Sequence, residues 1–265
     1  MEPTENEIAL IDTHAHIAGW DYDEDRDEVL DRARAAGILA VIDFGTCMDL
    51  SEKTVALAKS HSLVYAGVGI HPSDAFPMTA ADDDRLVRWT KEEKVVAIGE
   101  IGLDYYWEKD SDRRALQREI FIRQLDLARQ LHLPVCIHDR EAHGDTLAIL
   151  KKEGRENFGV IHCFSGSLEM ARELLKLGWY LGIDGPITYK NAAKAPEIVR
   201  AIPSERLLLE TDCPYLSPTP YRGKRNEPAF VRKTAEFAAK FRDESLEVLS
   251  HQTTDNARRL YGLPK

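Results

Sequence analysis

Six side chains of the types that bind metal ions stand beside short apolar runs spread over the whole sequence. Two are histidines in the segment IDTHAH, and the other four close the runs VVAIGE, PVCIH, FGVIH and LLLETD. Imidazole nitrogens and carboxylate oxygens together suit Zn²⁺ and other divalent transition metals. We therefore predict a metal centre formed by His14, His16, Glu100, His138, His162 and Asp212.

The spacing of these residues predicts two cations rather than one. His14 and His16 are two positions apart, so on an extended backbone both side chains face the same side. Glu100 has two carboxylate oxygens and is expected to bridge two cations about 3.5–4 Å apart. Asp212 would complete the first metal beside the histidine pair, and the remaining two histidines would complete the second.

Glu100 and Asp212 are also the predicted catalytic residues. A water or hydroxide held between two cations becomes a nucleophile near neutral pH, because the metals lower its pKa. Asp212 would hold one metal and accept the proton of this water. The alternative is that both are structural carboxylates, but a buried and unpaired carboxylate is costly in free energy.

The elements that must position these residues alternate along the chain. Apolar runs rich in β-type residues are followed by amphipathic runs of helical period, and the latter include 24–36, 52–60 capped by Ser51, 168–177 and 227–241. Strands are expected at residues 8–12, 40–44, 64–70, 95–101, 134–137, 159–161, 179–183 and 206–210.

Eight strand and helix units without a linker predict a single (β/α)8 barrel, the TIM barrel, over residues 8–265. Residues 1–7 are expected to form a flexible N-terminal tail. A doubly wound open sheet is the alternative, but no glycine-rich phosphate fingerprint follows the first strand. Active sites of TIM barrels lie at the carboxyl ends of the strands, which is where we place the metal centre.

The composition narrows the class of partner. The formal net charge of −10 repels polyanions at long range, which favours a small or locally held substrate over a long duplex. The four cysteines form no CxxC motif, which favours free thiols in a reducing cytosol. The first seven residues are polar and acidic, unlike a secretory signal. We expect a cytoplasmic monomer without membrane attachment or an obligate protein partner.

Several further residues are candidates for substrate binding. His71 ends the third expected strand and would either orient a substrate oxygen or cap the following loop. Three cations in the loop after the last strand would contact phosphates, or else belong to a solvated loop tied by ion pairs: Arg222, Lys224 and Arg225. Arg140 is a second candidate of this kind. Tyr105, Tyr106 and Trp107 would either stack on a base or pack over the barrel.

These motifs resemble the TatD-type metal-dependent deoxyribonucleases, a branch of the amidohydrolase superfamily. The resemblance extends from Ile11 onward and rests on the segments DTHAH, GIHP, GEIGLDYYW, IHDREA, HCFSGS, GIDGPITYKNA, ETDCPYLSPTPYRGKRNEP and TTDNARRLYGL. It implies a (β/α)8 barrel, divalent metal ions and hydrolysis of phosphodiesters, often from DNA ends. All six ligand positions of the family pattern are filled. Other branches of the superfamily bridge their metals with a modified lysine near the position of Glu100.

The expected function is that of a metal-dependent hydrolase acting on ester bonds. The leading hypothesis is a deoxyribonuclease, an exonuclease that acts on DNA ends or single strands with two divalent ions, Zn²⁺, Mg²⁺ or Mn²⁺. The alternative keeps the metals and changes the bond, as in an amide or ester hydrolase such as a deacylase of aminoacyl-nucleic acid. A scaffold without activity would lack some of the ligands, and none is missing.

Overall fold

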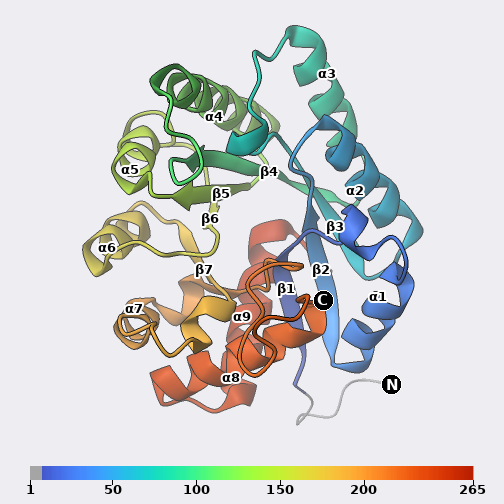
Figure 1. Cartoon of the computed structure of the whole chain (residues 1–265), viewed down its shortest axis with the longest axis vertical. Coiled ribbons are helices and arrows are strands. Elements are labelled where there is room, and N and C mark those ends of the chain that lie inside the picture. The colour runs from blue at the N-terminus through green and yellow to red at the C-terminus, as the bar shows by residue number, and fades with distance from the viewer. Residues whose placement is uncertain (1–7, 265) are drawn as a thin grey trace.

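Eight strands lie in one sheet, in the order in which they occur along the chain. The structure is a computed structural model that describes residues 8–264, so the expected tail at residues 1–7 lies outside the described residues. Each strand pairs with the next in parallel. Figure 1 shows the helices arranged around the strands. The predicted (β/α)8 architecture is therefore confirmed.

The strands are β1 Leu10–Ala15, β2 Ile38–Phe44, β3 Val64–Val68, β4 Val95–Asp104, β5 Val135–Arg140, β6 Gly159–Ile161, β7 Tyr180–Ile183 and β8 Leu207–Leu209. The α-helices are α1 Arg26–Ala35, α2 Met48–Ser60, α3 Ala80–Trp89, α4 Ser111–Leu131, α5 His143–Lys152, α6 Leu168–Lys176, α7 Ala195–Ala201, α8 Val231–Arg242 and α9 Leu246–Tyr261. Short 3-10 turns η1 Trp20–Tyr22, η2 Pro72–Asp74, η3 Gly185–Thr188, η4 Ser204–Arg206 and η5 Pro228–Phe230 complete the order.

The barrel closes where the chain that follows β8 meets β1. The backbone N–H of Asp212 donates to the carbonyl of His14 at 2.9 Å, and that of His16 donates to the carbonyl of Cys213 at 2.8 Å. Both bonds lie just beyond the carboxyl end of β8. The first and last strands are thus fastened together at the rim where we place the metal centre.

Alternate strand residues fill the interior of the barrel. Ile42 and Phe44 of β2 belong to an inner apolar cluster, whereas Val41 packs outward against the helices, because successive side chains of a strand point to opposite faces. Tyr261, at the end of α9, is part of the same inner cluster. At the other end the ring of Phe44 stacks on His14, with centroids 4.7 Å apart. The inner core therefore supports the site directly.

Five strand ends differ from the sequence prediction, and the third and eighth strands end earlier than expected, at Val68 and Leu209. The first, fourth and fifth strands end three residues later than expected, at Ala15, Asp104 and Arg140. β4 changes register against β5 between Ile98 and Ile101, and an irregularity of this kind re-aims side chains while the strand continues. Three candidate ligands therefore lie within strands rather than at their ends: His14, Glu100 and His138.

The predicted helix cap at Ser51 was wrong. Ser51 was expected to cap a helix over 52–60, but α2 already begins at Met48, with Cys47 as its N-terminal cap. The hydroxyl of Ser51 instead donates to the carbonyl of Gly69 and accepts the backbone N–H of the same residue, each at 3.2 Å. The expected cap at Ser167 is confirmed, since its side chain accepts the N–H of Met170. Among the helices of residues 8–264, none combines the length and apolar character that crossing a membrane requires.

Candidate metal centre

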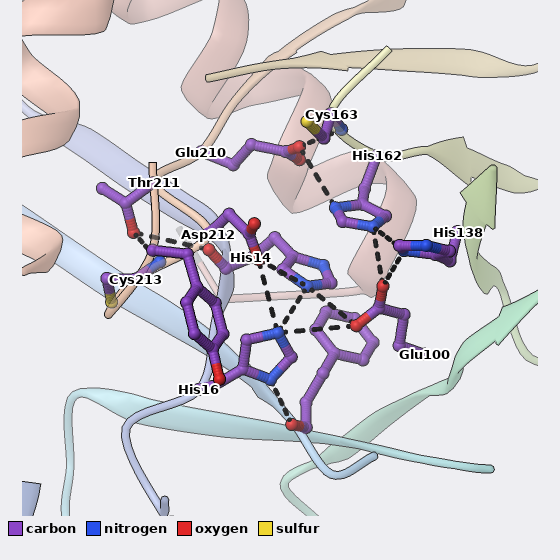
Figure 2. A network of polar contacts seen from close by, with 12 residues as sticks. His14, His16, Glu100, His138, His162, Cys163, Glu210, Thr211, Asp212 and Cys213 are labelled. Atoms are coloured by element: carbon purple, nitrogen blue, oxygen red, sulfur yellow. Dashed lines mark hydrogen bonds and ion pairs between the residues drawn. The ribbon is translucent and has the colours of Figure 1, made fainter. Parts of the chain in front are cut away.

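The six candidate ligands come together at the carboxyl ends of the strands, although they originate from five of them (Figure 2). His14 and His16 come from β1 and the residue after it, Glu100 from β4 and His138 from β5. His162 directly follows β6, and Asp212 lies three residues beyond β8. His14 and Glu100 are almost completely buried, at 0% and 2% exposure. The site is therefore buried inside the mouth of the barrel rather than exposed on its outer edge.

Two ligand nitrogens on the β1 side lie close to one oxygen from each of two carboxylates. The Nε2 atoms of His14 and His16 are 3.2 Å apart, and each lies 3.4 Å from Oε2 of Glu100. Oδ1 of Asp212 is 3.7 Å from Nε2 of His14 and 3.4 Å from that of His16. Two ligands about 2.1 Å from a tetrahedral Zn²⁺ would be about 3.4 Å apart. These separations fit one tetrahedral cation.

The other oxygen of Glu100 faces the strands β5 and β6. Its Oε1 lies 2.7 Å from Nδ1 of His138 and 2.7 Å from Nε2 of His162. The two imidazole nitrogens are 3.3 Å apart. Glu100 thus presents one oxygen to each of two histidine groups, as a bridging carboxylate would.

Three of the candidate histidines have a partner on the nitrogen that faces away from Glu100. Nδ1 of His16 lies 2.8 Å from the carbonyl oxygen of Phe44, which accepts its proton and leaves the Nε2 lone pair for a metal. Nε2 of His138 lies 3.0 Å from Oδ2 of Asp104. Nδ1 of His14 lies 3.1 Å from Sγ of Cys136. Such contacts fix the orientation of a metal-binding imidazole.

The electrostatics of the cluster are those of a site with ionised carboxylates. Burial opposes ionisation, but nearby imidazoles hold the pKa of Glu100 well below its usual range and also lower that of Asp212. Burial alone would lower the pKa of His16, yet the carboxylates of Asp212 and Glu100 outweigh it and raise this pKa to about 9. The same negative field would attract a divalent cation.

The types and positions of these ligand atoms suit divalent cations. Three overlapping groups place one ligand atom from each residue within 4.8 Å of the others: His14 with Glu100 and His162, His14 with His16 and Asp212, and His71 with Glu100 and His138. Within residues 8–264, no lysine or arginine forms an ion pair with Glu100 or Asp212. Imidazoles and carboxylates without a lysine or arginine partner are the donors that Zn²⁺ and Mn²⁺ accept.

Several non-glycine residues at this rim adopt left-handed backbone conformations. Asp212 has φ 56°, Cys163 φ 44°, Glu141 φ 57° and Leu216 φ 53°. Such conformations cost about 1 kcal/mol or more for residues with a Cβ atom, and they gather where structure is shaped for function. The backbone around the candidate ligands is therefore held in place by its surroundings.

A pocket of about 500 Å³ opens above the cluster. His71 lines it, with Nε2 3.6 Å from Oε1 of Glu100. Nδ1 of His71 accepts the backbone N–H of Ser73 at 3.1 Å, so the proton of the neutral ring must lie on Nε2 and point into the pocket. Burial lowers the pKa of His71 to about 3, which keeps the ring neutral. Both suggested roles of His71, as loop cap and as pocket donor, are compatible with this geometry.

The cations expected to bind phosphate lie in different surroundings. Arg140 lines the pocket, and its guanidinium lies over the rings of Tyr106 and Trp107 at 4.1 and 5.7 Å. Arg222 and Lys224 are exposed in the loop after β8 and do not line the pocket. Arg225 donates to Oδ2 of Asp25 at 2.5 Å. A substrate contact by the three loop cations stays a prediction.

Sequence reasoning missed the partners of the ligands. Asp104 is 2% exposed and contacts His138; it lies four residues after Glu100 and so on the same face of β4. Recognising it required the true end of that strand. Glu210, which is fully buried, lies 3.6 Å from Nδ1 of His162, and a Cβ atom at Gly182 would collide with its carboxylate. The burial of Glu210 could not be read from the segment LLLETD.

Comparison with known proteins connects this site to a family. Residues 11–262 match the family model described as TatD related DNase. A Bacillus subtilis (strain 168) protein named "Uncharacterized metal-dependent hydrolase YabD" is 44% identical over 257 residues, which are 95% of this chain and 98% of that protein. A Klebsiella pneumoniae (strain 342) protein named "3'-5' ssDNA/RNA exonuclease TatD" is 36% identical over 260 residues, covering 96% and 98% of the two chains.

A solved structure gives the same result for the fold. The crystal structure of YjjV, a TatD homologue from Escherichia coli K12, superposes with a TM-score of 0.89 at 31% identity. The match covers 96% of this chain and 98% of that one. Because the likeness extends over nearly the whole chain, it includes every strand that contributes a candidate ligand.

Proposed function

The chain belongs to the TatD-related DNase family of metal-dependent hydrolases, within the amidohydrolase superfamily, and from that premise we propose that it hydrolyses phosphodiester bonds of DNA. The proposed substrate is a single strand or a DNA end, from which the protein removes nucleotides as an exonuclease. A relative named as an exonuclease of single-stranded DNA and RNA supports this choice of substrate.

One observation carries the proposal. Glu100 directs its two oxygens to two separate histidine groups, and on one side the Nε2 atoms of His14 and His16 are 3.2 Å apart. Oε2 of Glu100 and Oδ1 of Asp212 each lie 3.4–3.7 Å from both of these nitrogens. This is the spacing of ligands around one tetrahedral cation, with a bridging carboxylate toward a second. The proposed ligands are His14, His16, Glu100, His138, His162 and Asp212.

Two bound cations would supply a hydroxide nucleophile at neutral pH and offset the charge that develops on the phosphate oxygens. The protein would contribute the rest of the chemistry. The ionised Asp212 would accept the proton of the attacking water. Nε2–H of His71 points into the pocket and would donate a hydrogen bond to a phosphate oxygen.

The pocket wall favours a substrate that contains nucleotides. Arg140 forms no ion pair within residues 8–264 and lines the pocket beside the ligands. A guanidinium without a carboxylate partner is suited to phosphate. Trp107, 69% exposed beside it, offers a flat surface to a base. An amide or ester hydrolase whose substrate lacks nucleotides needs neither feature, whereas a deacylase of aminoacyl-nucleic acid would use both and remains the second candidate.

The test is hydrolysis of single-stranded DNA labelled at either the 3′ or the 5′ end. Metal-stripped protein would receive Mg²⁺, Mn²⁺ or Zn²⁺ in turn, beside Glu100→Ala, Asp212→Ala and Glu173→Ala. Glu173 is a matched control, because its carboxylate pairs with lysines on the outer surface. We expect metal-dependent ladders from wild type and Glu173→Ala, and a loss of about 10³-fold or more in the other two variants.

Two results would contradict the proposal. Undiminished cleavage by Glu100→Ala would remove the bridging carboxylate from the mechanism. Absence of cleavage by folded, metal-loaded protein would end the nuclease assignment. In the second case, turnover of an aminoacyl-nucleic acid ester by the same preparation would establish the carbonyl hydrolase instead.

A further inference from the structure

Exposed aromatic rings gather at the rim of the candidate metal centre. Of the large exposed side chains in residues 8–264, five are aromatic, and four of these belong to loops that follow β1, β4 or β8: Trp20, Tyr106, Trp107 and Tyr215. The fifth, Phe158, precedes β6 and so lies toward the opposite end of the barrel. Exposed apolar surface that is concentrated in this way marks a binding site more often than chance.

A second, narrower cleft adjoins the metal pocket. His16, Thr46 and Tyr215 line both cavities. Trp20 and Tyr215 line the narrower cleft and remain 74% and 58% exposed, while Phe44 and Leu50 contribute apolar surface to it. A group in this cleft would lie beside the histidine pair of β1, and Trp107 and Arg140 line only the wider pocket.

The backbone that carries these rings is held rigidly. Tyr22, two residues after Trp20, is fully buried, and its hydroxyl donates to the carbonyl of Asn226 at 2.6 Å. The side-chain amide of the same Asn226 donates to the carbonyl of Tyr215 at 2.6 Å. One buried asparagine therefore ties the two aromatic segments together.

Arg225 reinforces the same segment. Its guanidinium donates to the carbonyl of Asp21 at 2.6 Å and to the carboxylate of Asp25, and it lies 4.6 Å from the ring centre of Tyr22. Side chains that are exposed at the tip while their backbone is fixed lose little entropy when a ligand binds. This is the design of a binding platform rather than of a loose surface residue.

The charges in the cleft select the kind of ligand. No lysine or arginine lines it, and Asp21 is part of its wall, so a phosphate would be repelled there. The wider pocket, by contrast, contains Arg140 and the candidate metal ligands. A phosphate above the metals would leave the attached base to be placed in this aromatic cleft, which has no lysine or arginine in its wall.

We propose that the cleft between Trp20 and Tyr215 binds an unpaired nucleobase of the nucleotide strand whose phosphate lies at the metal centre. This proposal rests on the proposed nuclease function and extends it. Stacking on aromatic side chains tolerates every base, because each base has a π-face. A base inside a duplex has both faces covered by its neighbours, so the cleft would admit single strands and frayed ends and reject paired DNA.

The first test uses metal-stripped, full-length protein and deoxyadenosine, a nucleoside without phosphate. Saturation transfer in NMR would report contact between the protein and the base protons. We expect a signal for wild type, Trp20→Phe and the matched control Phe158→Ala, and loss of it in Trp20→Ala and Tyr215→Ala. Absence of any signal in wild type, or an undiminished signal in Trp20→Ala, would overturn the proposal.

The second test measures kinetics with single-stranded DNA. Trp20→Ala should raise KM about 5- to 150-fold, the range that loss of one stacked base implies, with kcat within about twofold and with recovery in Trp20→Phe. A substrate whose terminal base is replaced by an abasic residue should show the same raised KM with wild type and no further rise with Trp20→Ala. A rise in KM that persists on the abasic substrate would contradict the proposal.

The two proposals fail separately. Nucleoside binding that depends on Trp20, without any phosphodiester cleavage, would retain the cleft and reject the nuclease function. Cleavage with equal KM in wild type and Trp20→Ala would retain the nuclease function and reject the cleft.

Discussion

Asp104 provides the sharpest test of the proposed metal centre, because its two oxygens have different partners. Oδ2 lies 3.0 Å from Nε2 of His138, whereas Oδ1 accepts the backbone N–H groups of Tyr106 and Trp107 at 2.9 and 3.0 Å. The carboxylate of Asp104 thus connects His138, a proposed ligand, to the loop that carries Trp107 of the pocket wall. The substitutions Asp104→Asn and Asp104→Ala separate these two functions.

Asp104→Asn replaces one oxygen by an NH₂ group. If the remaining oxygen keeps the two loop amides, the NH₂ group faces Nε2 of His138 and can only donate to it. The ring would then carry its proton on Nδ1, the nitrogen that faces Glu100. Loss of a hydrogen bond to a charged group costs roughly 1.5–3 kcal/mol, or about a 10- to 150-fold increase in the Kd of the cation bound through His138.

Two measurements on each variant test this reasoning. Competition with a chelating dye gives the Kd of each cation, and hydrogen exchange reports protection of the Tyr106 and Trp107 amides. Asp104→Asn should weaken the binding of one cation but preserve the protection of the two amides. Asp104→Ala should weaken the binding of the same cation and also lose the amide protection. If Asp104→Asn binds two cations with wild-type affinity while its loop amides stay protected, Asp104 does not orient His138.

Three further outcomes follow from the site and its rim. Arg140→Ala should raise KM for single-stranded DNA about 10-fold at low salt, with a smaller effect at high salt; equal KM values would remove Arg140 from substrate binding. Arg225 lowers the pKa of Asp25 from its ordinary 3.8, so their stabilisation is present above about pH 4 and is lost as the pH falls through the lower folded-state pKa. In urea unfolding, Arg225→Ala should cost up to about 1 kcal/mol near pH 7, and the gap should narrow toward pH 3; a gap independent of pH contradicts the pairing. Cation at 100 times its Kd should stabilise the fold by about 2.7 kcal/mol and raise Tm by roughly 5–10 °C over metal-stripped protein, and an unchanged Tm would argue against binding to the folded state.

Residue type and strand order were enough to predict where the candidate ligands meet. His162 and Asp212 are 50 positions apart, yet each follows an apolar run, and closed parallel barrels collect the ends of their strands at one rim. The prediction required no knowledge of distances. It depended only on the alternation of short strands with helices, which the structure confirms.

The contacts that shape the site could not be predicted in the same way. Asn226 contacts Tyr22, which lies 204 positions earlier, and no local pattern connects two such distant residues. Asp104 was missed because the fourth strand was expected to end at Ile101, whereas it continues past a change of register. Serine is a residue type favoured at helix caps, but the hydroxyl of Ser51 bonds to Gly69, directly after β3. In each case a tertiary contact outweighs a local preference.

Because the barrel closes only near the end of the chain, the candidate centre can form only after most of the chain has been synthesised. His14 and His16 leave the ribosome early, but Asp212 and the backbone bonds that close β1 against the segment after β8 come nearly 200 residues later. A partial chain therefore has neither the closed rim nor the full ligand set. Nascent copies, or copies truncated before Asp212, would lack hydrolytic activity, so the proposed cleavage would be restricted to molecules that have finished folding.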